Sequence, residues 1–151
     1  MGTIENQIKI MEMLAINEEA VSQLYRAYAE KFPEHKDFWV SISLEEIDHA
    51  RWIREIESRI KEGKAYFDDS RIKLESVKVS IDYVNGQIAK AKTQPMMPRA
   101  ALFIAADLEN SIIESKWFNA CESDSLEFKR LVFDLDQATT RHREELQKIM
   151  R

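Results

Sequence analysis

The feature that most constrains the fold is a helical stripe with two ionisable residues at its centre. Its seven residues follow one another at alternating steps of three and four, the spacing at which side chains project to one face of an α-helix. The stripe consists of Trp39, Ile42, Glu46, His49, Ile53, Ile56 and Ile60. Five of these residues are apolar, while Glu46 and His49 occupy the middle. Because an unpaired carboxylate in a protein core is very costly, these two need polar partners from other parts of the chain.

Length and composition narrow the class of protein. A chain of 151 residues suits one domain, taken to span residues 1–151, and its three glycines and three prolines are few, which favours helices. The net charge of −5 with interspersed signs argues against nucleic-acid binding. No apolar run approaches the roughly 20 residues of a membrane span, and the start lacks a signal peptide, so we expect no membrane partner and a cytoplasmic location. Cys121 is the single cysteine, which excludes an internal disulfide and a Cys-based zinc or rubredoxin-type iron site.

Two long helices are expected in the first part of the chain. The first runs from a Thr3 cap to about Phe32, where Pro33 stops it. The second runs from an Asp37 cap to Glu62, before Gly63. The inward stripe of the first helix is Ile4, Ile8, Met11, Ala15, Glu18, Ser22, Tyr25, Ala29 and Phe32. This stripe also carries one acid, Glu18, among apolar or small residues. The short connection between the helices predicts that they run antiparallel.

Residues 64–97 form a long connection of a different character. Residues 66–70 are typical of a loop, and a weaker helical stripe follows, which Asn85 and Gly86 are expected to bend. This stripe is Val77, Ile81, Val84, Ile88 and Ala91. About 35 residues is too long for a tight hairpin and suits a crossover along a helix bundle.

Two more long helices are expected after this connection. The third begins at Pro98 and runs to about Ala120, with the stripe Leu102, Ala106, Glu109, Ile113, Trp117 and Ala120. Ser123, Asp124 and Ser125 offer caps for the fourth, whose stripe is Phe128, Val132, Leu135, Thr139, His142, Leu146 and Ile149. We therefore predict an all-α fold: a four-helix bundle with a long crossover, containing an extra helix, between helices two and three.

Each long helix carries an inward polar residue near its middle. In an antiparallel bundle, such positions fall at the same height, so these side chains are expected to converge. The converging set is Glu18, Glu46, His49, Glu109 and His142. The order is Glu on one helix, Glu-x-x-His on the next, and then Glu and His on the last two, so the pattern nearly repeats by halves.

This arrangement resembles the ferritin-like superfamily, in particular rubrerythrin-like proteins that lack a rubredoxin domain. In that family, a Glu from each of two helices and Glu-x-x-His from the other two surround a pair of irons. Tyr25, seven residues after Glu18, also matches a spacing found in these proteins. The resemblance implies that Glu18 and Glu109 are terminal ligands and Glu46 a bridging ligand. His49 and His142 would each bind one metal.

The chain departs from the family pattern at residue 139. The Glu-x-x-His motif of helix four is here Thr139-Thr140-Arg141-His142, so one bridging carboxylate is missing. Three carboxylates supply a charge of −3 against +4 for two ferrous ions, which predicts weaker or partial binding. Asp136 and Glu145 lie about one turn away and are alternative ligands outside the family register. Oxygen and nitrogen ligands suit iron or manganese, with zinc as a further occupant.

Two functions remain open from the sequence. The resemblance implies a di-iron oxidoreductase that reduces peroxide or oxidises ferrous iron, forms a homodimer, and needs an external electron donor because no rubredoxin centre is present. The alternative, which Thr139 favours, is a bundle with a degraded or mononuclear site that serves as a structural, sensing or partner-binding module. At residue level, Glu46 with His49 could be a hydrogen-bonded core pair, and His142 a core histidine. Glu45 is expected on the flank, as an acceptor behind the ligands or as a solvated charge.

Overall fold

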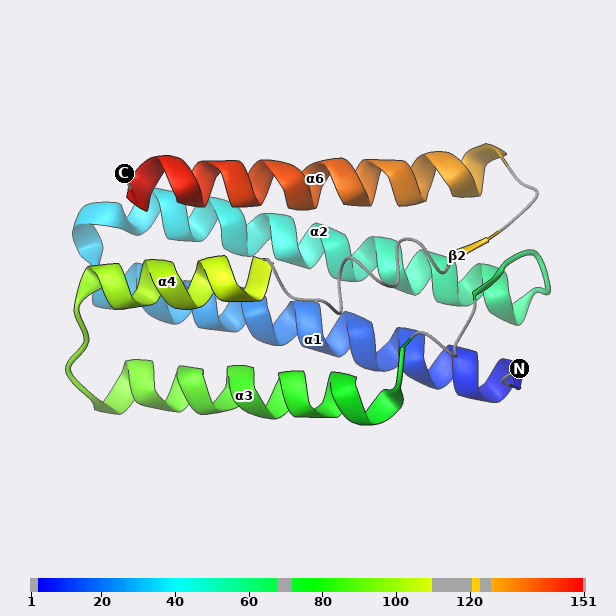
Figure 1. Ribbon diagram of the computed structural model, residues 1–151, viewed down its shortest axis with the longest axis horizontal. Helices are drawn as coiled ribbons and strands as arrows, with labels where there is room; N and C mark the ends of the chain where they lie inside the picture. Colours follow the sequence, from blue (N-terminus) through cyan, green and yellow to red (C-terminus); the bar gives the residue numbers. More distant parts are fainter. Residues whose placement is uncertain (1–2, 68–71, 110–120, 123–125, 151) are drawn as a thin grey trace.

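The computed structural model describes residues 3–67, 72–109, 121–122 and 126–150. Five α-helices account for most of the described chain, and two strands of two residues each pair with one another (Figure 1). The elements are α1 (Ile4–Lys31), a 3-10 helix η1 (Pro33–His35), α2 (Lys36–Lys61), β1 (Tyr66–Phe67), α3 (Leu74–Thr93), α4 (Pro98–Glu109), β2 (Cys121–Glu122) and α6 (Leu126–Met150). The predicted all-α class is confirmed. None of the helices in the described part is both long and apolar enough to cross a membrane.

The ends of the first two helices follow local sequence signals. The Thr3 hydroxyl accepts a hydrogen bond from the Asn6 backbone N–H at 3.1 Å, and α1 ends just before Pro33, as predicted. Gly63, with φ of +74°, lies just beyond α2, a backbone conformation that glycine adopts without a steric penalty. Asp37 is not the cap of α2, because η1 leads directly into a helix that begins at Lys36. Its carboxylate lies instead in the first turn, where it interacts favourably with the positive N-terminal end of the helix dipole.

Three further expectations need correction. The helix α3 continues unbroken through Asn85 and Gly86, since buried Val84 and Gln87 on either side hold it against the core and outweigh a glycine cost of about 1 kcal/mol. Tyr66 and Phe67 are not only loop but the strand β1, which pairs antiparallel with β2. Ile4, at the very start of α1, is 58% exposed rather than part of the core.

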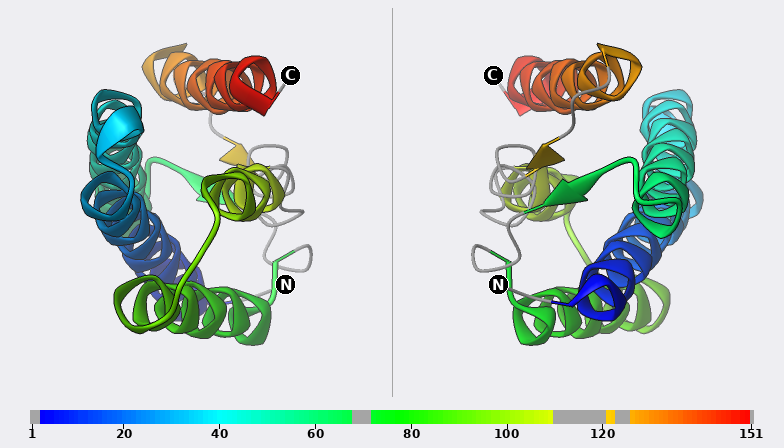
Figure 2. Two further views of the ribbon diagram at one scale, coloured as in Figure 1. Left: turned by 90° about the vertical axis from the view of Figure 1, so that its left-hand side faces the viewer. Right: turned by 90° about the vertical axis from the view of Figure 1, so that its right-hand side faces the viewer.

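The helices lie along one another in a single bundle. The helix α2 returns antiparallel to α1 and packs on it, α3 packs on the other side of α1, and α6 contacts both α2 and α4. Seen end-on, α3 and α6 lie at opposite edges, with the α1–α2 pair on one side and α4 on the other (Figure 2). The helix α3 carries the chain back along the bundle, so α4 runs in the same direction as α2 (Figure 1).

The apolar core is divided into two clusters along the bundle. One joins the first part of α1 to the last part of α2 and to α3, and it consists of Ile10, Met11, Leu14, Ala15, Ala50, Ile53, Ile56, Ile60, Ala65, Ile72, Val77 and Ile81. The other joins the last part of α1 to the first part of α2, and it consists of Ala20, Val21, Leu24, Tyr25, Tyr28, Ala29, Phe32, Trp39, Ile42, Val84, Ala91, Ala101, Leu102, Ala105 and Leu146. Glu18 on α1, and Glu46 and His49 on α2, fall between these clusters in sequence. A polar layer therefore separates two apolar ones.

Parts of the last two predicted helices lie outside the described residues. This holds for Ile113, Trp117 and Ala120 of the third predicted stripe, and for the caps at residues 123–125. In α6, the described buried positions are Ala138, His142 and Leu146, spaced by one helical turn. Ile149, near the end of α6, is 36% exposed, so the predicted inward stripe does not continue to that position.

Candidate metal centre

The centre begins on α2, where Glu46 and His49 lie one turn apart. All seven residues of the predicted α2 stripe are buried, as the three–four spacing predicted. Glu46 is 0% exposed and His49 is 2% exposed, so both side chains are removed from water. His49 Nδ1 lies 3.4 Å from Glu46 Oε2. The other five residues of this buried stripe, before and after the pair, are apolar, so Glu46 and His49 are its two polar members.

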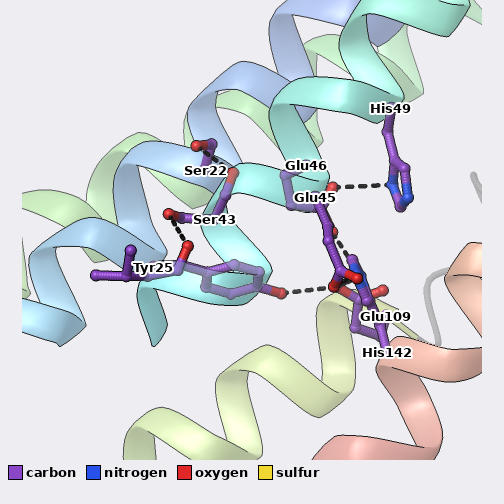
Figure 3. Close-up of polar contacts among 9 residues, drawn as sticks. Ser22, Tyr25, Ser43, Glu45, Glu46, His49, Glu109 and His142 are labelled. Atoms are coloured by element: carbon purple, nitrogen blue, oxygen red, sulfur yellow. Dashed lines mark hydrogen bonds and ion pairs between the residues drawn. The ribbon is translucent and has the colours of Figure 1, made fainter. Parts of the chain in front are cut away.

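The second oxygen of Glu46 faces the imidazole of another helix. His142, from α6, is 1% exposed, and its Nδ1 lies 3.1 Å from Glu46 Oε1 (Figure 3). Each carboxylate oxygen of Glu46 thus faces the Nδ1 of one histidine. The rings of His49 and His142 stack with centroids 5.1 Å apart. One buried carboxylate therefore joins two neighbouring imidazoles from α2 and α6.

Two other carboxylates contact His142. Glu109 Oε1, from the end of α4, lies 3.6 Å from His142 Nδ1. Glu45 Oε2 contacts the opposite nitrogen, Nε2, and the Glu45 side chain is 34% exposed. Burial lowers the pKa of His142, but its hydrogen bonds with the carboxylates of Glu45 and Glu46 and the nearby carboxylate of Glu109 outweigh burial and raise that pKa well above its usual value. In the metal-free chain, His142 is therefore an imidazolium held between carboxylates.

The pKa values of Glu45 and Glu109, the acids around His142, are lowered rather than raised. The hydrogen bond with His142 lowers the pKa of Glu45. Burial raises the pKa of Glu109, but the neighbouring His142 and the hydrogen bond donated by Tyr25 outweigh burial, and the net result is a lowered pKa. These acids remain ionised at neutral pH, as metal ligands must be.

His49 has a different environment from His142. Burial and the positive charge of His142 lower the pKa of His49 to about 4, so His49 is neutral at pH 7. Among the described residues, its Nε2 has no hydrogen-bond partner. Trp52, one turn later on α2, stacks on it with ring centroids 5.9 Å apart. A neutral imidazole is the form that binds a metal ion.

Tyr25 connects α1 to the centre. Its side chain is fully buried, and its hydroxyl donates a hydrogen bond of 2.9 Å to Glu109 Oε1 (Figure 3). Tyr25 is thus both a buried core residue and a hydrogen-bond donor to Glu109. The other carboxylate oxygen, Glu109 Oε2, is buried and has no hydrogen-bond partner among the described residues. Tyr25 therefore orients Glu109 so that one oxygen faces His142 and the other accepts no bond.

Two predicted site residues are less closely tied to this group. Glu18 is buried on α1, at 4% exposure, but the group of neighbouring ligand atoms consists of Glu46, His49 and His142. The role of Glu18 as a ligand stays a prediction. Thr139 lies one turn before His142 in α6, but its side chain, like that of Asp136, lies outside what the structure describes. Glu145 is exposed, one turn after His142.

The donor set fits a metal ion. The ligand atoms of Glu46, His49 and His142 all lie within 4.8 Å of one another, and all three residues are buried. Two ligand atoms on neighbouring coordination positions, each about 2.1 Å from a metal, lie about 3 Å apart. The contacts of 3.1 Å and 3.4 Å between Glu46 and the two histidines are close to that separation. This buried group could therefore bind a metal ion, with nitrogen and oxygen ligands.

The stacking of Trp52 on His49 was not predicted, although residues three apart on a helix are neighbours and the sequence therefore carries a signal for it. For Glu45 the sequence left two alternatives, an acceptor behind the ligands or a solvated charge, and the structure places its carboxylate against His142. The identity of that partner depends on how α6 lies against α2. No family model, curated protein or solved structure matches this chain. Its function is therefore inferred from the geometry of these side chains.

Proposed function

We propose that this protein binds a transition metal at the buried centre of Glu46, His49 and His142, with Glu109 as a further ligand. The observation that carries the proposal is that the two oxygens of Glu46 each face one imidazole nitrogen, at 3.1 Å and 3.4 Å, in a dry core. A carboxylate between two imidazoles is the geometry expected of a bridging ligand. Iron or manganese suits such donors, and zinc would also bind.

We further propose that the chain is a ferritin-like protein of the rubrerythrin-like type. Ligand-type residues near the middle of α1 and α2, at the end of α4 and in α6 support this, as does the return of the chain through α3 before α4. In this reading, α3 is the extra helix of the crossover, and Glu18 is a ligand from α1. A homodimer is part of the same proposal.

With iron bound, the centre would supply electrons for the reduction of peroxide, or would allow ferrous iron to be oxidised with oxygen or peroxide as the electron acceptor. The residues of the chain would prepare this chemistry in three ways. Glu46 and Glu109 supply negative charge to hold the metal, and Tyr25 fixes the orientation of Glu109. The two apolar clusters keep water from the ligands, which strengthens their electrostatic interactions. An external electron donor would complete a catalytic cycle.

Metal analysis after anaerobic reconstitution with ferrous iron tests the proposal. We expect at least one tightly bound metal per chain, and a clear loss in Glu46→Ala. Glu55→Ala is a matched control, because Glu55 lies on the same helix but is 54% exposed and pairs only with Arg59 among the described residues. Less than one metal per chain in the wild type, with no change in Glu46→Ala, would refute metal binding.

A second candidate function is a structural or partner-binding bundle without redox chemistry. The observation that favours it is that His142, as an imidazolium, already neutralises part of the carboxylate charge without a metal. Oxidation of bound ferrous iron by peroxide or oxygen discriminates the redox function from the structural one, since turnover excludes a purely structural role.

The variant Thr139→Glu tests an intermediate possibility, a centre that binds one metal. It should tighten binding of a second metal, and an unchanged stoichiometry would contradict the predicted register of α6.

A further inference from the structure

The two histidines of the centre differ in the partner of the ring nitrogen that faces away from Glu46, which is Nε2 in both. His142 Nδ1 faces Glu46 and Glu109, while its Nε2 contacts Glu45. His49 Nδ1 faces Glu46, but no described residue hydrogen-bonds its Nε2. The two imidazoles therefore present the same nitrogen to the centre, and only one of them has a carboxylate behind it (Figure 3).

We propose that Glu45 is a positioning residue which, by accepting a hydrogen bond from His142 Nε2, directs Nδ1 of His142 to the metal and strengthens metal binding on the His142 side of the centre. The inference rests on the proposed metal binding. It adds that the two sides of the centre are unequal and names the residue that makes them so.

The physical reason is the effect of a carboxylate behind a metal-bound imidazole. Such a carboxylate fixes the tautomer, holds the ring in one orientation, and makes the other nitrogen a stronger base. Loss of a partner of this kind typically weakens metal binding about 10- to 100-fold. Among the described residues, none hydrogen-bonds the Nε2 of His49, and the stacked ring of Trp52 is its contact outside the ligand group.

The location of Glu45 supports this assignment. It precedes Glu46 on α2, so its backbone is fixed by the same helix that places the bridging carboxylate. Its side chain is 34% exposed, against 0% for Glu46. The partly exposed carboxylate thus approaches His142 from the solvent side, while the buried one faces the interior of the centre. One helix therefore holds both nitrogens of a histidine that comes from α6.

The test uses cobalt(II) as a spectroscopic probe in the full chain, with wild type, Glu45→Ala, Glu45→Gln and Asp48→Asn. Asp48→Asn is the charge control, because it removes one nearby exposed acid from α2 without touching His142. Binding affinity and stoichiometry come from titration. Proton NMR of the cobalt protein shows exchangeable imidazole N–H signals shifted by the metal, which report directly on Nε2. Circular dichroism confirms that each variant is folded.

We expect the first cobalt to bind about 10- to 100-fold more weakly in Glu45→Ala, with less loss in Glu45→Gln, which keeps an acceptor. The slowly exchanging N–H signal of His142 should be present in the wild type and in Asp48→Asn, and should exchange rapidly in Glu45→Ala. Wild-type binding with an unchanged signal and affinity in Glu45→Ala would overturn the inference. Loss of a whole metal from the stoichiometry would also overturn it, since Glu45 would then be a ligand. If the wild type binds no metal, the proposed function itself fails.

Discussion

The stability of the metal-free protein should depend on pH through His49. This histidine is 2% exposed, and its pKa falls from 6.5 to about 4 on folding, because burial and the charge of His142 disfavour its protonated form. In the unfolded chain it regains its usual value. At about 1.4 kcal/mol for each tenfold change, the shift corresponds to about 3 kcal/mol. That is a large share of the stability of a domain of this size.

The direction of the effect follows from which state binds the proton. Above pH 6.5, His49 is neutral in both states and its contribution is fully present. Between pH 6.5 and about 4, the unfolded state binds a proton that the folded state does not, so the free energy of unfolding falls as the pH falls. Below the folded pKa, both states are protonated and no further loss comes from this residue.

Denaturant unfolding in the presence of a chelator, at several pH values from 7 to 4.5, measures this contribution. The wild type should lose free energy of unfolding over this range, while His49→Gln should lose much less, whatever its stability at pH 7. His35→Gln is the matched control, because it removes an exposed histidine of η1 in place of the buried one. If wild type and His49→Gln differ in this loss by less than about 1 kcal/mol, His49 is not buried in neutral form.

Three other perturbations are expected to have measurable effects. As pH rises above about 6.5, the metal-free chain should lose up to about 1.4 kcal/mol per pH unit through the raised pKa of His142, and denaturant titration of His142→Gln should lack this slope. Tyr25→Phe removes the hydrogen bond to Glu109 and should cost about 1.5–3 kcal/mol in denaturant unfolding without changing the helix content. Ile56→Ala should cost about 2–5 kcal/mol in the same assay, since Ile56 is 0% exposed. Leu44→Ala, at 50% exposure on the same helix, should cost less than about 0.5 kcal/mol, and equal losses would contradict the assigned inward face of α2.

The inward face of α2 could be predicted because one helix determines it. The period of 3.6 residues places Glu46 and His49 on the same side as the apolar residues, whatever the neighbouring helices do. The same holds for Glu18 and Tyr25 on α1, which are buried as expected. The acids among these buried residues also indicated a polar centre, because a buried carboxylate needs polar or positively charged partners.

Contacts between helices could not be predicted in the same way. The approach of Glu45 to His142 depends on the rotation of α6 about its own axis, which the packing of several helices decides together. In α6, burial at Ala138, His142 and Leu146 follows one-turn steps, and Ile149 is half-exposed although it shares the predicted stripe. The pairing of β1 with β2 joins residues 66 and 122, which no local pattern relates.

The contact of Glu45 with His142 also bears on the charge balance of the centre. In the proposed two-metal centre, which has no carboxylate at residue 139, Glu18, Glu46 and Glu109 would supply a charge of −3 against +4 for two divalent ions. Glu45 brings the carboxylate charge to −4, although it comes from α2 rather than α6. In the metal-free chain, the proton of His142 takes part of the role of the cation, so each metal that binds at His142 must displace a proton. The absence of a carboxylate at residue 139 and the contact of Glu45 with His142 would therefore act on the same quantity, the charge of the proposed centre, and metal affinity should rise with pH as His142 gives up its proton.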